Sequence, residues 1–158
     1  MQFVWLKKVR RNVKNVTRRR RTRRKVAETK HYIAHKEKAR ALVHSRLAHW
    51  NQFYGYTYGR VAIRDQRSRW GSCSSRRNLN FNYRLVFIPI ELVDYVIVHE
   101  LCHLEHFNHS ELFWCAVAKA LPDYKRLKAD LLAVSKNMHL YMDDKKPATV
   151  EESNTRLA

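Results

Sequence analysis

The sequence has few of the features that mark several large classes of protein. Its 158 residues include only three cysteines, an odd number without regular spacing, which gives no disulfide framework. No apolar run approaches the roughly 18 residues that cross a bilayer, so we expect no membrane partner. Internal repeats are absent, and the apolar start is too short for a signal peptide. These absences, with 45% apolar residues, favour one folded domain in the cytoplasm.

Acidic residues are scarce at the start of the chain. Residues 1–50 carry 17 Lys and Arg against two Glu, whereas residues 51–158 carry 15 against 12 Asp and Glu. The net charge of +18 therefore comes mostly from the first third of the chain. Its densest part, Arg18–Arg24, is interpreted either as a solvated tail or as a non-specific contact to nucleic acid.

Composition and hydrophobic periodicity divide the chain into three parts. Residues 1–28 are predicted to be a basic, poorly ordered arm, residues 29–142 the folded domain, and residues 143–158 a polar, flexible tail. Within the domain, helical spacing of apolar residues predicts four helices. They are expected at about residues 30–51, 90–106, 109–121 and 124–134. Alternating residues predict strands at 60–65 and 78–85, which makes the fold α+β, with helices packed on a small antiparallel sheet.

The stretch HELCHLEHFNH, residues 99–109, contains four histidines and two glutamates. His99 and His103 are four residues apart on a helix that is apolar almost all round, so their rings point the same way and can share one zinc ion. Glu100 completes the His-Glu-x-x-His arrangement, in which the glutamate is the general base for hydrolysis. A metal also explains why a buried helix tolerates these polar side chains.

A catalytic zinc needs a third protein ligand and an open position. His109 is favoured if the helix breaks at Asn108, an asparagine that tolerates left-handed and capping conformations, and the chain doubles back. His106 is nearly on the zinc face, but in a straight helix it lies about 10 Å along the axis from His99. His106 and Glu111 remain alternatives to His109.

Three stretches carry a resemblance to a known family. RSRWGSCSSRRNLNFNYRL, IPIELVDYVIVHELCHLEHFNHSELFW and PDYKRL closely resemble the YgjP-like metallopeptidase domain, over about Lys30–Leu132. This family is similar to a minimal zincin and is related to the SprT-like and Wss-type metalloproteases. The resemblance implies a zincin-like fold, one Zn2+ ion held by His99, His103 and His109, and Glu100 as the catalytic residue.

The function predicted from these observations is a zinc-dependent metallopeptidase acting on a peptide or protein. One alternative is a metal-dependent nucleotide phosphohydrolase that holds phosphates with arginines near the strands. These are Arg60, Arg64, Arg67, Arg69, Arg76, Arg77 and Arg84. A second alternative is a zinc-binding module that associates with nucleic acid. Asn80, Asn82 and Arg84, on the polar face of the second strand, are the candidates for contacting a substrate aligned along that strand.

The remaining candidates are in or near the segment RWGSC. Trp70 is expected to pack, and Cys73 to be either a small buried residue or a group that approaches the zinc. Cys102 and Cys115 lie in predicted helices and are expected to pack in the core.

Overall fold

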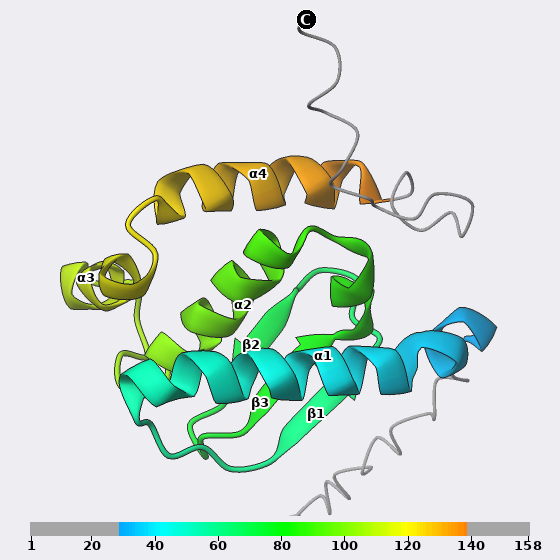
Figure 1. Ribbon diagram of the computed structural model, residues 1–158, viewed down its shortest axis with the longest axis horizontal. Helices are drawn as coiled ribbons and strands as arrows, with labels where there is room; N and C mark the ends of the chain where they lie inside the picture. Colours follow the sequence, from blue (N-terminus) through cyan, green and yellow to red (C-terminus); the bar gives the residue numbers. More distant parts are fainter. Residues whose placement is uncertain (1–28, 139–158) are drawn as a thin grey trace, which may run out of the picture.

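A computed structural model describes residues 29–138, so the predicted arm, the predicted tail and residues 139–142 of the predicted domain lie outside them (Figure 1). The described part contains four helices and a three-stranded sheet, which confirms the α+β class. The elements follow in the order α1 (Lys30–Tyr54), β1 (Val61–Arg64), β2 (Gly71–Cys73), β3 (Leu79–Asn82), α2 (Ile90–Cys102), α3 (Glu111–Ala120) and α4 (Tyr124–Lys136). None of the helices in this range combines the length and apolar character needed to cross a membrane.

Helix α1 begins and ends at residues suited to those positions. The side chain of Thr29 accepts a hydrogen bond from the backbone N–H of Tyr32, and Gly55 ends the helix with a φ of 66°. The helix therefore continues beyond the predicted end near residue 51. Its buried side is regularly spaced, as predicted, and consists of Tyr32, Ala39, Val43 and Leu47. Ile33, next to Tyr32 on this helix, is by contrast 59% exposed.

The sheet is mixed, so the prediction of a wholly antiparallel sheet was wrong. Its strand order is β1-β3-β2, with β1 parallel and β2 antiparallel to β3. The chain passes from β1 to the far edge, forms β2, and returns through a hairpin into the centre as β3. The predicted second strand also ends earlier, at Asn82. The side chain of Asn82 accepts a hydrogen bond from the N–H of Arg84 and begins a 3-10 turn over Tyr83–Phe87.

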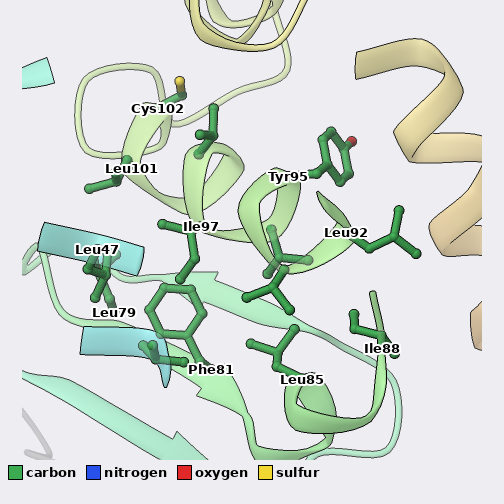
Figure 2. Close-up of a cluster of buried hydrophobic side chains, with 14 of the residues drawn as sticks. Leu47, Leu79, Phe81, Leu85, Ile88, Leu92, Tyr95, Ile97, Leu101 and Cys102 are labelled. Carbon is green, nitrogen blue, oxygen red and sulfur yellow. The ribbon is translucent and has the colours of Figure 1, made fainter. Parts of the chain in front are cut away.

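Helix α2 lies at the centre of the domain and contacts α1, β2, α3 and α4. One side of it packs toward the sheet, where Ile97 lies close to Phe81 and Leu79 (Figure 2). Leu92 and Tyr95 point the other way, toward α4 (Figure 2). Burying each large apolar side chain contributes about 1.5–3 kcal/mol, so this helix is held firmly between the two layers.

Candidate metal centre

The His-Glu-x-x-His sequence lies at the end of α2, but the helix ends four residues earlier than predicted. It ends at Cys102, and His103 follows in the capping position. The next residues form tighter turns, in which the N–H of Leu104 donates to the carbonyl of Leu101. The guanidinium group of Arg77, from the β2–β3 hairpin, donates to the Leu104 carbonyl and so helps to fix this turn.

The return of His109 does not depend on Asn108 in the way that was predicted. Among the described residues, only Arg77 and Gly55 have a positive φ, so Asn108 does not adopt the left-handed conformation. The residue that precedes α3 is Ser110 rather than Asn108. The tight turns after Cys102 therefore reverse the chain and bring His109 back toward the end of α2.

The structure brings three histidines together at this point. His99 Nε2 lies 3.2 Å from His103 Nε2 and 3.1 Å from His109 Nε2. One ligand atom from each of the three lies within 4.8 Å of the others, and neither His106 nor Glu111 belongs to the group. Nitrogens bound tetrahedrally to one zinc ion would be about 3.3 Å apart, given zinc–nitrogen bonds of about 2.0–2.1 Å. The spacing of the three rings therefore fits a zinc ion.

The hydrogen-bonding capacity of the ring nitrogens also favours a metal ion between the three histidines. His103 Nδ1 lies 2.9 Å from the carbonyl oxygen of His106, which can only accept, so Nδ1 carries the hydrogen. In a neutral His103 ring, Nε2 then carries a lone pair and can only accept a hydrogen bond. His99 Nε2 can either donate one hydrogen bond or accept one, so its contacts with His103 and His109 cannot both be favourable between neutral rings. A cation shared by three lone pairs removes this conflict.

The electrostatic environment keeps two of these rings neutral. Burial, together with the charges of the neighbouring His103, His109 and Lys128, lowers the pKa of His99 to about 3. Burial also lowers the pKa of His103. A neutral imidazole is the form that binds a metal. The His106 carbonyl also fixes the orientation of the His103 ring, so residue 106 contributes through its backbone and not its side chain.

Glu100 is buried beside this cluster, with 6% of its surface exposed. Burial outweighs the opposing effects of the Arg69 charge and of hydrogen bonding from the Cys73 backbone, and raises the pKa of Glu100 to about 8. Its Oε2 atom has no hydrogen-bond partner within residues 29–138. A buried carboxylate with a free oxygen and a raised pKa is suited to accept a proton from water near neutral pH.

Gly71 of β2 makes room for the Glu100 side chain. A Cβ atom added at this glycine would lie 2.6 Å from both Cγ and Oε1 of Glu100, and 2.9 Å from its Cδ. No other residue type fits there while Glu100 keeps its position. This contact gives the RWGSC segment a role that its sequence did not reveal.

The three cysteines differ in their surroundings. Cys102 is buried, as predicted, but Cys115 is exposed, and its predicted core position was wrong because it lies on the outer side of α3. Cys73 is partly buried in β2 and lies near Glu100, so that burial first and the carboxylate second raise the pKa of its thiol. It is not part of the three-histidine group.

Asn80, Asn82 and Arg84 make contacts within the fold. Asn80 bonds the side chains of Ser72 and Arg64. Asn82 is buried and donates to two backbone carbonyls in the β1–β2 loop, and Arg84 pairs with Asp65 at 2.9 Å. The last two line a cavity of about 370 Å³ that does not include the histidines. Their role in substrate binding stays a prediction.

A larger cavity, of about 490 Å³, lies directly beside the candidate centre. His99 and Glu100 form part of its wall, together with Gly71 and Tyr95. Tyr95 was not among the residues predicted from the sequence, although a signal for it was present. Tyr95 lies four residues before His99, so the helical spacing that aligned His99 with His103 also places Tyr95 on that face.

Comparisons with known proteins show which family the chain belongs to. The model of the YgjP-like metallopeptidase domain matches residues 5–133. The chain belongs to this family. A crystal structure of the metallopeptidase zymogen of Pyrococcus abyssi abylysin is similar, with a TM-score of 0.53 and 25% sequence identity, over 58% of this chain and 92% of that one. No curated protein gave a significant match. YgjP-like membership identifies the chain as a metal-dependent peptidase domain, in accord with the resemblance seen in the sequence.

Proposed function

We propose that the chain is a zinc-dependent metallopeptidase in which His99, His103 and His109 hold one zinc ion and Glu100 is the general base. The observation that carries the proposal is the convergence of three Nε2 atoms beside a buried glutamate, with 3.1 and 3.2 Å between neighbouring nitrogens. A zinc ion bound there would acidify a water molecule and polarise the substrate carbonyl.

The residues of the chain then have separate tasks. The three rings are held in place by the end of α2, the His106 carbonyl and the loop before α3. Glu100 accepts the proton of the attacking water and passes it to the leaving amine. A bound cation would stabilise the charged form of Glu100 and offset part of the effect of burial on its pKa.

The sheet supports a peptide as the substrate, but the strand along which the peptide would align differs from the predicted one. β3 is the central strand and pairs on both sides, so it cannot accept an extended peptide. β2 is an edge strand in the described part of the chain, and its Gly71 touches Glu100. An extended peptide could therefore add to the edge of β2 and reach the candidate metal centre.

Lys125 and Lys128 in the cavity wall would attract a phosphate as well as a carboxylate, but the arginines that suggested the phosphohydrolase alternative are not there. Among the described residues, none of the seven arginines near the strands lines the cavity that contains His99 and Glu100. The basic segment Arg18–Arg24 lies outside the described residues, so contact with nucleic acid stays a prediction.

Turnover of the purified full chain, with its bound metal quantified, tests the proposal. We expect wild type to cleave an unfolded protein substrate, and Glu100→Gln to keep about one equivalent of zinc while losing turnover. The matched variant Glu37→Gln, at an exposed glutamate of α1 outside the cavity, should retain activity. Undiminished turnover by Glu100→Gln would refute the role of Glu100, and hydrolysis of nucleoside triphosphates in place of protein would favour the alternative.

A further inference from the structure

The cavity beside the metal centre has a mainly apolar wall. From the α2 side and the start of β2, it is lined by Val96, Tyr95 and Trp70. From α4, it is lined by Ala129, Leu131 and Leu132, and Leu132 is 59% exposed. Its volume of about 490 Å³ lies within the range of roughly 300–1,000 Å³ that is typical of ligand pockets. An exposed leucine in the wall of such a cavity gains apolar burial when a partner group fills it.

The cavity is continuous with the proposed catalytic residues. His99, Glu100 and Gly71 all belong to its wall, and Gly71 lies against the Glu100 side chain. A polypeptide whose scissile carbonyl lies at the three histidines therefore places a neighbouring side chain at the mouth of this cavity. The occupant is thus a substrate side chain, and the apolar wall requires it to be apolar.

The charge near the cavity is positive. Lys125 and Lys128 of α4 line it, and Lys128 Nζ lies 4.7 Å from the centre of the Trp114 ring. The acidic residues Asp123 and Asp130 of α4 are instead paired with Arg126. Apart from Glu100, the charged groups of the cavity wall are therefore the two lysines, which favour a carboxylate close to the apolar side chain.

We propose that this cavity is the specificity pocket of the peptidase, which accepts a large apolar side chain next to the scissile bond and favours a nearby carboxylate on the same substrate. This inference rests on the proposed function, because it takes the three histidines as the place of cleavage. Trp70, whose indole N–H donates to the Ser135 hydroxyl at 2.7 Å, joins the start of β2 to α4 and so fixes the width of the pocket.

Cleavage-site mapping tests the apolar part of the proposal. The zinc-loaded full chain digests an unfolded casein, and mass spectrometry identifies the new termini. We expect Phe, Leu, Met or Trp to be enriched at one position beside the cleaved bond. Ala129→Trp fills the pocket from an exposed position and should lower kcat/KM for such a peptide at least tenfold, since lost contacts of a methylene or more are worth about 10–200-fold. The control Ala133→Trp, also exposed on α4 but outside the pocket, should stay within twofold of wild type.

A charge-reversal pair tests the carboxylate preference. Lys125→Glu/Lys128→Glu should lower cleavage of a peptide with an acidic residue near the apolar one, and raise cleavage of the matching lysine peptide. Lys119→Glu/Lys136→Glu changes the net charge by the same amount, on residues outside the pocket. It should leave unchanged the ratio between cleavage of the acidic peptide and cleavage of the lysine peptide. The difference in this ratio between the wild type and Lys125→Glu/Lys128→Glu should shrink as added salt screens the charges. Equal ratios for the two double variants would overturn the carboxylate preference.

Failure of the inference can be told apart from failure of the proposed function. If wild type cleaves with no apolar preference while Glu100→Gln is inactive, the proposed function stands and the pocket assignment is overturned. If wild type does not cleave, peptide binding to Glu100→Gln by fluorescence anisotropy still tests the pocket. Tighter binding of a phenylalanine peptide than of its alanine counterpart, lost in Ala129→Trp, supports the pocket, and equal binding overturns it.

Discussion

The contact between Gly71 and Glu100 allows a quantitative prediction. In Gly71→Ala, the new Cβ would lie 2.6 Å from Cγ and Oε1 of Glu100, well inside contact distance. Glu100 is 6% exposed and cannot swing freely into solvent, so either its carboxylate or the β2 backbone must move. Overpacking of this kind costs about 1–3 kcal/mol of folding free energy.

The backbone itself should tolerate alanine at this position. Gly71 does not have a positive φ, and glycine within a strand is less stable than alanine by roughly 0.5–1 kcal/mol. Without the Glu100 side chain, Gly71→Ala should therefore be neutral or stabilising. The sign of the effect thus depends on whether Glu100 is present.

Urea unfolding of four full-length proteins measures this dependence. They are wild type, Gly71→Ala, Glu100→Ala and the double variant, all with chelator present so that metal affinity does not enter. We expect a coupling free energy of at least about 1 kcal/mol, with the double variant more stable than the sum of the two single changes implies. The changes in unfolding free energy of substitutions at independent sites add within about 0.3–0.5 kcal/mol. Additivity of Gly71→Ala and Glu100→Ala within that range would therefore refute the steric argument.

Activity gives the second part of the same prediction. Because displacement of a catalytic group by about 1 Å can cost 100-fold in rate, metal-loaded Gly71→Ala should lose most of its turnover. Its zinc content should remain that of wild type, since the three atoms nearest to the new Cβ all belong to Glu100 and none to a histidine. Full turnover in a folded Gly71→Ala protein would show that Glu100 does not need its present position.

Two further predictions concern the histidines and the interface between α1 and α2. His109→Ala should lose zinc, measured by metal analysis of the purified protein, whereas His106→Ala should keep it because only the backbone carbonyl of His106 contacts the cluster. Arg46→Ala should destabilise the fold by about 3 kcal/mol in thermal or urea unfolding, since it leaves Asp94 half-buried without its two hydrogen bonds of 2.6 and 2.8 Å. The exposed Arg126→Ala should have a far smaller effect, and equal losses in the two variants would contradict this ranking.

The parts of the structure that sequence analysis predicted well depend on local information. The existence of helices α1 and α2 and the shared face of His99 and His103 all follow from helical periodicity. The two histidines are one turn apart on the same helix, so their proximity needs no knowledge of the tertiary fold.

The errors fall where contacts from distant segments decide the outcome. Helix α2 stops at Cys102, although helical spacing continues to His106, and Arg77 from the β2–β3 hairpin binds the carbonyl of Leu104 just beyond that end. The parallel pairing of β1 with β3 depends on β2 being a strand at the far edge. Neither hydrophobic periodicity nor turn composition carries that information.

Strand β2 shows why the remaining part of the site was hard to predict. Its residues, Gly71, Ser72 and Cys73, include a strong turn former and have weak strand propensity, so local preference opposes the observed structure. The strand forms because it pairs with β3 and packs against α2, and its glycine is the residue that leaves space for Glu100. A larger, more strand-favouring residue at position 71 would strengthen the local signal and displace the proposed base. The conflict between local propensity and observed structure at this strand is therefore a consequence of the geometry that the proposed catalytic site requires.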